Sequence, residues 1–270
     1  MHKKNRILAT DLDGTLFMPM SKGIGSGIGS LKKKLADNPA VCLVFASGRS
    51  LKLIEEAIEQ YDLPKPDMTV GDVGTSIYVH NGESWELDAG WRELMSDGWQ
   101  GHSREEIAGI LNGIDELQQQ ESDRLTEFKQ SYYLDIKTSW PLLEKKIKAL
   151  LLDHGIRSEL VYSTQPLEGR AFLDILPLNA AKDEAVHYVM KKLGLDLDDV
   201  LYAGDSGNDL LPLTRGFNAV VVQNASTDLK EKVREVAQKK GVSQKIFFAT
   251  KPCAQGVVEA IDHFDFFRRS

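Results

Sequence analysis

The sequence predicts an α/β fold: a Rossmann-like core built on a parallel sheet, interrupted by a smaller inserted α+β domain. Residues 6–12 (RILATDL) and 41–47 (VCLVFAS) are short apolar runs. Each is followed by a helical pattern, at residues 30–37 and 50–62. Continuous apolar runs of this length are typical of strands buried on both faces of a parallel sheet, and their alternation with helices is typical of open α/β sheets.

The pattern changes after the turn signal Asn81-Gly82, which predicts a hairpin. Residues 83–166 are expected to form the inserted domain. Helical spacing and strand-like alternation both occur in it, at residues 103–117 and 140–155 and at residues 125–136 and 157–166, respectively. A small sheet backed by two helices is the simplest assembly of these segments.

Strand–helix alternation resumes after residue 166. Strands are predicted at residues 171–177, 200–205, 218–223 and 245–250, and helices at residues 181–194, 208–216, 227–241 and 254–264. We therefore expect one discontinuous core domain, made of residues 1–82 and 167–270, around the insertion.

Composition and charge restrict the class of protein. The 270 residues are 42% hydrophobic and 27% charged, as in ordinary globular proteins. A net charge of −7 argues against nucleic acid as a partner, and no apolar run approaches the length of a membrane span or of a signal-peptide core. Two cysteines without a C-x-x-C pair suit a reducing cytoplasm, where we expect the protein to reside.

Polar side chains follow the predicted strands of the core. In open parallel α/β sheets, ligands bind at the carboxyl ends of the strands. The residues at these ends are Asp11, Asp13, Ser47, Gly48, Arg49, Gly74, Thr75, Lys182, Asp205 and Asp209. We expect them to converge on one crevice.

This set of residues suits phosphoryl chemistry. Four carboxylates without clustered histidine or cysteine suit a hard cation, for which we predict Mg²⁺. Lys182, the Ser47 hydroxyl and the Gly48 N–H suit the oxygens of a phosphoryl group. Because a cation offsets the repulsion between carboxylate and phosphate, Asp11 can attack phosphorus as a nucleophile. Asp13 can then exchange protons with the leaving oxygen and with water.

A neighbouring glycine run, Gly23 to Gly29, is a competing phosphate site, because glycine-rich turns that open into helices bind phosphate through backbone N–H groups. It begins twelve residues after Asp11 rather than at a strand end. Its G-x-G-x-G-x-G spacing fits neither G-x-G-x-x-G nor a P-loop. We predict a loop that ends where Ser30 caps a helix.

Four motifs resemble, in order, those of the haloacid dehalogenase-like phosphohydrolases. They are residues 11–15 (DLDGT), residues 46–49 (ASGR), Lys182 ahead of a helix, and residues 204–209 (GDSGND). The resemblance implies a Mg²⁺-dependent phosphatase. The position of the insertion resembles the subgroup with a type-IIB α/β cap, which recognises the substrate.

The resemblance also implies roles for individual residues. Asp11 would be the nucleophile and Asp13 the acid/base. The Asp11 carboxylate, the Asp13 carbonyl and Asp205 would bind the metal, with Asp209 holding a metal-bound water. Ser47 and Lys182 would bind the phosphate.

A second resemblance, to sucrose-phosphate phosphatases, covers both core and cap. It is carried by residues 73–78 (VGTSIY), 129–132 (KQSY), 174–177 (DILP) and 260–266 (AIDHFDF). It implies that the sugar lies between Gly74-Thr75 and the cap residues Lys129 and Ser131. Arg49 and Asp174 are further candidate substrate contacts. Ser76 stands where that family usually carries glutamate, so mannosylfructose phosphate stays open beside sucrose 6-phosphate.

Three functions remain at this point. The leading one is hydrolysis of a sugar phosphate monoester through an aspartyl phosphate, with sucrose 6-phosphate as the expected substrate. A phosphomutase or a broad metabolite phosphatase would use the same chemistry. A non-catalytic partner of a glycosyltransferase would have no chemical need for the four aspartates and Lys182. We expect a monomer, with association to a sucrose-phosphate synthase-type glycosyltransferase as a further hypothesis.

Overall fold

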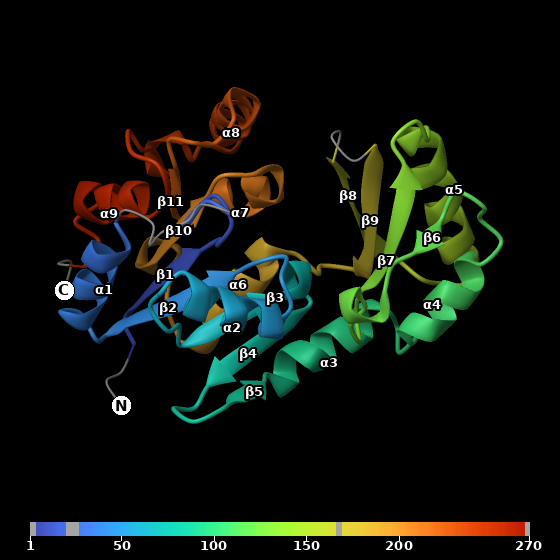
Figure 1. Cartoon of the computed structure of the whole chain (residues 1–270), viewed down its shortest axis with the longest axis horizontal. Helices are drawn as coiled ribbons and strands as arrows, with labels where there is room; N and C mark the ends of the chain where they lie inside the picture. Colours follow the sequence, from blue (N-terminus) through green and yellow to red (C-terminus); the bar gives the residue numbers. More distant parts are fainter. Residues whose placement is uncertain (1–3, 20–26, 166–168, 268–270) are drawn as a thin grey trace. The chain divides into compact units, whose positions relative to one another are not determined.

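The computed structural model describes residues 4–19, 27–165 and 169–267. The chain forms two compact units, one made of Met1–Leu87 and Ala181–Ser270 and the other of Asp88–Ala180. Within the described ranges the larger unit holds an eight-stranded sheet and the smaller unit a four-stranded sheet (Figure 1). The predicted α/β fold class is confirmed.

The sheet of the larger unit has the strand order β12-β11-β10-β1-β2-β3-β4-β5. Six strands are parallel: β1 (Arg6–Thr10), β2 (Val41–Ala46), β3 (Met68–Gly71), β10 (Val200–Gly204), β11 (Asn218–Val221) and β12 (Ile246–Phe248). The antiparallel strands β4 (Ser76–His80) and β5 (Trp85–Leu87) extend it at one edge. Every residue of β1, β2, β10 and β11 is buried, which accounts for their continuous apolar runs.

Helices cover both faces of this sheet. One face packs in a single apolar cluster, through residues such as Leu8 and Phe45, against α1 (Ile28–Ala36), α2 (Leu51–Gln60) and α9 (Cys253–His263). Ile7 and Ala9 alternate with Leu8 and are equally buried, so the other face is covered too. In the described residues of the larger unit, the α-helices outside the cluster are α6 (Lys182–Lys192), α7 (Leu210–Leu213) and α8 (Thr227–Lys240), of which α6 contacts β2 and β3.

Helix α1 begins earlier than the sequence predicts. Its N-cap is Gly27, with φ of 103°, and Ser30 lies inside the helix, so the predicted cap at Ser30 is wrong. A Cβ at Gly27 would lie 2.6 Å from the backbone nitrogen of Gln255 in α9. Both the left-handed backbone and this close approach require glycine. Gly23 and Gly25, in the same run, lie outside the described residues.

The smaller unit is an antiparallel sheet of order β6-β7-β9-β8. Its strands are β6 (Gln118–Gln119), β7 (Gln130–Asp135), β8 (Ser158–Gln165) and β9 (Arg170–Pro177). Helices α4 (Arg104–Leu111) and α5 (Trp140–Asp153) lie on one side of it, as Figure 1 shows, and α3 (Ala89–Gly98) begins the unit. The buried apolar residues of the two packed helices are Ile107 and Leu111 in α4 and Leu143, Ile147 and Leu151 in α5.

The boundaries of the units differ from the predicted ones. Residues 171–177 are predicted as a core strand, but they form most of β9, which pairs with β7 and β8. An apolar run fixes a strand but not the sheet in which it pairs. Residues 85–87 form β5 of the larger sheet, so the smaller unit begins at Asp88 rather than at residue 83. Helix α4 ends at Leu111, before the helix-breaking Asn112-Gly113, rather than at residue 117.

Two observations bear on the protein's surroundings. None of the helices in the described residues is both long and apolar enough to cross a membrane. Cys42 and Cys253 are both free and buried.

Candidate active site

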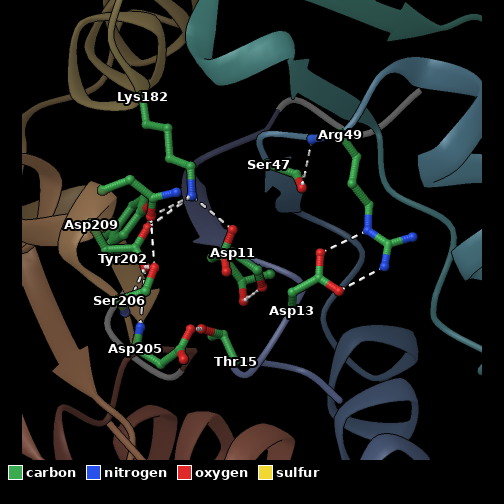
Figure 2. Close-up of polar contacts among 12 residues, drawn as sticks. Asp11, Asp13, Thr15, Ser47, Arg49, Lys182, Tyr202, Asp205, Ser206 and Asp209 are labelled. Carbon is green, nitrogen blue, oxygen red and sulfur yellow. Dashed lines mark hydrogen bonds and ion pairs between the residues drawn. The ribbon is translucent and has the colours of Figure 1, made fainter. Parts of the chain in front are cut away.

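Several loops of the larger unit bring polar side chains to the carboxyl ends of its strands. Asp11 and Asp13 follow β1, Ser47 and Arg49 follow β2, and Asp205 follows β10. Lys182 opens helix α6 and Asp209 closes the 3-10 helix η5 (Gly207–Asp209). Figure 2 shows these side chains around the end of β1.

Asp11, Asp205 and Asp209 form an acidic cluster in which one carboxylate oxygen from each residue lies within 4.8 Å of the other two. Asp11 is 5% exposed and Asp209 is fully buried. The ammonium of Lys182 donates to Asp11 Oδ1 at 2.7 Å and to Asp209 Oδ1 at 3.0 Å. Lys182 therefore bridges two of the three carboxylates (Figure 2).

Burial governs the charges in this cluster. It raises the pKa of Asp11 to about 8, although Lys182 lowers it, and it raises the pKa of Asp205 to about 6, although a hydrogen bond from Thr15 lowers it. Burial alone would lower the pKa of Lys182, but the carboxylates of Asp11 and Asp209 raise it above its ordinary value.

The cluster fits a hard divalent cation. When ionised, its three carboxylates and the one ammonium leave two negative charges uncompensated, and all three acids offer oxygen atoms. Oxygen ligands are those preferred by Mg²⁺ and Ca²⁺. The cluster of Asp11, Asp205 and Asp209 could therefore hold a metal ion.

Asp13 has a different partner. Arg49 donates from Nε and Nη2 to the two carboxylate oxygens of Asp13, each at 2.7 Å (Figure 2). Such a bidentate pair is strong and directional. The side chain of Asp13 is 36% exposed and that of Arg49 is 27% exposed. If Asp13 acts as an acid/base, it does so either while paired with Arg49 or after this ion pair has opened.

The loop after β2 leads into helix α2. The Ser47 hydroxyl accepts a hydrogen bond from the Arg49 N–H at 3.2 Å. Ser50 is the N-cap, as predicted, but its side chain makes no capping hydrogen bond. The helix N-terminus contributes positive partial charge at this strand end. A Cβ at Gly48 would make only ordinary contact, with Val73 at 3.9 Å, so packing alone does not require glycine there.

The turn after β3 supports the start of α6. Asp72, Val73 and Gly74, which form the 3-10 helix η1, have φ angles of 52°, 63° and 102°. For the β-branched Val73 this conformation is strained. A Cβ at Gly74 would lie 2.5 Å from the carbonyl carbon of Ala181, so the turn packs directly against the residue that precedes Lys182.

Thr75 and Ser76 tie this turn together. The Thr75 hydroxyl donates to the Asp72 carbonyl at 3.0 Å. The Ser76 hydroxyl donates to the Asp72 carboxylate at 3.2 Å. Both side chains therefore have partners within the turn.

The remaining predicted substrate residues belong to the smaller unit. Lys129 precedes β7 and is only 8% exposed. Ser131 and Asp174 are register partners on β7 and β9, and the Ser131 hydroxyl donates to Asp174 Oδ1 at 2.5 Å. The partner of Asp174 is thus a side chain of the neighbouring strand.

Sequence reasoning missed three residues that hold the acidic cluster. The hydroxyl of Thr15 donates to Asp205 Oδ1 at 2.8 Å, and that of Tyr202 donates to Asp209 Oδ1 at 2.7 Å. Ser206 donates to Asp209 Oδ2 from its backbone N–H and from its hydroxyl. Thr15 and Ser206 lie inside the motifs already quoted. Tyr202 reads in the sequence only as part of a buried strand.

The fold and these side chains are those of a haloacid dehalogenase-like phosphoric monoester hydrolase. A family model described as sucrose-6F-phosphate phosphohydrolase matches residues 4–265, and the chain belongs to that family. Both resemblances seen in the sequence are confirmed.

Individual relatives agree with this assignment. Sucrose-phosphatase 1 of Nicotiana tabacum is 33% identical over 230 residues, which cover 83% of this chain and 50% of that protein. Mannosylfructose-phosphate phosphatase of Agrobacterium fabrum is 29% identical over 268 residues, which cover 97% and 98% of the two chains. The chain spans about half the length of the plant sucrose-phosphatases that it matches.

A solved structure extends the likeness to three dimensions. The sucrose-phosphatase of Synechocystis sp. PCC6803, determined in complex with sucrose and phosphate, matches with a TM-score of 0.78 at 27% identity. The match covers 97% of this chain and 98% of that one. It therefore includes both units of the chain.

Proposed function

We propose that this chain hydrolyses a sugar phosphate monoester with Mg²⁺, and that the ester is sucrose 6-phosphate. The observation that carries the proposal is the Asp11 carboxylate, buried at the end of β1 beside Asp205 and bridged through Lys182 to Asp209. A carboxylate held in this way can act as a nucleophile toward phosphorus. The family assignment supports the same chemistry.

The proposed reaction has two steps. An oxygen of Asp11 forms a bond to phosphorus while the sugar oxygen leaves with a proton from Asp13. Asp13 then takes a proton from the water that attacks the aspartyl phosphate, which releases phosphate and restores Asp11.

Binding of the phosphoryl group is assigned to Lys182, the Ser47 hydroxyl and the Gly48 N–H, beside the N-terminus of α2. Asp11, Asp205 and the Asp13 carbonyl would hold Mg²⁺, and Asp209 would hold a water molecule bound to the metal. When bound, Mg²⁺ supplies the positive charge that lets a carboxylate approach an anionic phosphate.

We infer that the smaller unit, Asp88–Ala180, is the cap that recognises the sugar. Its buried polar residues Lys129 and Ser131 and the half-buried Asp174, together with Gly74 and Thr75 of the larger unit, are the proposed sugar contacts. The sucrose-phosphatases and the mannosylfructose-phosphate phosphatase among its relatives support a disaccharide phosphate. Mannosylfructose phosphate is the second candidate, because that relative aligns over nearly the whole of both chains.

Phosphate release from a panel of esters tests the proposal. The panel contains sucrose 6-phosphate, mannosylfructose phosphate and common hexose phosphates, each with Mg²⁺ or with a chelator. We expect Mg²⁺-dependent release, with the highest kcat/KM on sucrose 6-phosphate.

Other outcomes reassign the function. A preference for mannosylfructose phosphate would change the sugar and keep the chemistry. Similar rates on every ester would indicate a broad phosphatase, and movement of phosphate between positions of one hexose would indicate a phosphomutase. No release from any ester would leave a non-catalytic partner.

We also propose that the chain is a cytoplasmic monomer that docks to a sucrose-phosphate synthase-type glycosyltransferase. The two free cysteines suit a reducing compartment. Glucosylglycerol-phosphate synthase of Pseudomonas anguilliseptica is 28% identical over 260 residues, which are 31% of that protein. A segment of this type therefore occurs within a synthase. Gel filtration of the chain alone tests the monomer, and gel filtration of the chain mixed with the glycosyltransferase tests the docking.

A further inference from the structure

Tyr202 is a buried tyrosine whose hydroxyl lies at the acidic cluster. It sits in the middle of β10, is fully buried, and donates to Asp209 Oδ1 at 2.7 Å (Figure 2). An ionised carboxylate only accepts hydrogen bonds, so in this contact the phenol is the donor.

The carboxylate of Asp209 is saturated with donors. Oδ1 accepts from Tyr202 and Lys182, and Oδ2 accepts from the N–H groups of Asp205 and Ser206 at 3.1 Å each. The Ser206 hydroxyl is a further donor, at 3.3 Å. Because an ionised carboxylate offers about four lone-pair sites, these donors use its capacity. Asp209 cannot rotate without breaking several of these bonds.

Strand β10 provides the space for this carboxylate as well as one of its donors. Successive residues of a strand point to opposite faces, so Tyr202 and Gly204 share one face of β10. A Cβ at Gly204 would lie 2.6 Å from Asp209 Cβ and 2.7 Å from its Cγ. The side chain of Asp209 thus packs against the Cα of Gly204, and the phenol of Tyr202, two residues earlier in the strand, donates to its carboxylate.

We infer that Tyr202 is a positioning residue for the metal site, acting through Asp209. It fixes the plane of the Asp209 carboxylate, and that carboxylate in turn fixes the Lys182 ammonium and the Asp205–Ser206 turn. This inference rests on the proposed Mg²⁺-dependent function. Without the phenol, Lys182 is the donor that remains at Oδ1 in the described residues, so the carboxylate plane, and with it the geometry of Asp205 and Lys182 around the cation, is held less firmly. Loss of a partner behind the metal ligands typically weakens metal binding about 10- to 100-fold.

The test is Tyr202→Phe, which removes one hydroxyl and keeps the ring. We expect the Mg²⁺ concentration for half-maximal activity to rise about 10-fold or more, with a smaller fall in kcat at saturating Mg²⁺. A second measurement needs no substrate: at a fixed, non-saturating Mg²⁺ concentration, the metal-induced increase in Tm should shrink. Tyr61→Phe is the matched control, because Tyr61 is another buried tyrosine of the larger unit, stacked on Phe17.

A lower Tm with unchanged Mg²⁺ dependence would overturn the inference, since the hydroxyl would then only stabilise the fold. An equal loss of Mg²⁺ affinity in Tyr61→Phe would also overturn it. Measurements of Tm and of phosphate release on the wild-type protein distinguish a failure of this inference from a failure of the proposed function. A Mg²⁺-induced rise in Tm without phosphate release would refute the phosphatase and leave the Tm test of Tyr202 decisive. Absence of both would overturn both.

Discussion

The two units of the chain assemble their polar residues in different ways. In the larger unit, partners come from distant segments: Lys182 meets Asp11 across 171 residues of sequence, and Thr15 meets Asp205 across 190. In the smaller unit, the Ser131–Asp174 pair forms between neighbouring strands of one sheet. The first arrangement depends on strand ends that the fold brings together, whereas the second needs only β7 and β9. Changes in the two units should therefore affect chemistry and recognition separately.

The largest effect is expected from Asp11→Asn. An amide cannot form the aspartyl phosphate, and it also removes the charge that faces Lys182. We expect kcat for phosphate release to fall by about 10⁴-fold or more on every ester, because loss of a nucleophile is rarely compensated. Steady-state phosphate release from the sugar phosphate and from p-nitrophenyl phosphate measures it.

Asp37→Asn is the control for this change. Asp37 is an exposed aspartate of the same unit, at the C-cap of α1, and its substitution should leave kcat unchanged. Retention of more than about 1% of wild-type kcat by Asp11→Asn would rule out the covalent mechanism.

Asp13→Asn should have a smaller effect that depends on the leaving group. General acid–base catalysis contributes about 10²- to 10⁴-fold, so kcat on the sugar phosphate should fall within that range. p-Nitrophenolate leaves without a proton, so its release in the first turnover should be nearly as fast as in wild type, followed by slow turnover. Stopped-flow absorbance measures that burst. A first turnover slowed equally for both esters would remove Asp13 as the acid.

Arg49→Lys shows whether the Asp13–Arg49 pair matters to this step. Lysine keeps the charge but cannot make both hydrogen bonds of the guanidinium. If the pair holds Asp13 for proton transfer, this variant should show a weaker form of the same pattern. If Arg49 only binds the ester, KM should rise and the burst should keep its rate.

In the smaller unit, Lys129→Met should weaken recognition rather than chemistry. Methionine keeps an apolar stem of similar shape and removes the ammonium. A hydrogen bond from a charged group is worth about 1.5–3 kcal/mol, so KM for the sugar phosphate should rise about 10- to 100-fold. KM for p-nitrophenyl phosphate, which lacks the sugar, should change far less.

Lys137→Met removes an exposed lysine of the same unit and serves as its control. Similar increases in KM on both esters would show that Lys129 does not recognise the sugar. Asp11→Asn should lower kcat on both esters alike, whereas Lys129→Met should raise KM mainly for the sugar phosphate. This difference would show that the larger unit carries the chemistry and the smaller unit the recognition.

The same contrast explains what the sequence could predict. Asp11, Lys182 and Asp205 could be found because each follows a buried strand or opens the next helix, and parallel strand ends share one edge of a sheet. The role of Tyr202 could not be predicted. Its position in the sequence shows on which face of β10 it lies, but not that the Asp209 carboxylate lies against its hydroxyl. Close approach at Gly204 exists only in the folded chain.

In the smaller unit the sequence predicted elements better than their pairing. The helix predicted at residues 140–155 and the strand predicted at residues 157–166 could be recognised from periodicity. The placement of residues 171–177 could not, because a buried apolar strand looks the same in either sheet. The hydrogen bond between Ser131 and Asp174 depends on the pairing of β7 with β9, so it could not be predicted from the sequence either.

The smallest effect is expected at the contact that supports the loop after β1 in the larger unit. Asn224 donates from Nδ2 to the Gly14 carbonyl at 2.7 Å and accepts from the Cys253 N–H at 3.0 Å, which joins that loop to the start of α9. Asn224→Ala removes both bonds and should lower the free energy of unfolding by about 1–3 kcal/mol, measured by urea denaturation. Asn224→Asp keeps the acceptor for Cys253 but sets a carboxylate oxygen against the Gly14 carbonyl, so it should be at least as destabilising. An aspartate variant as stable as wild type would show that the bond to Gly14 does not stabilise the loop.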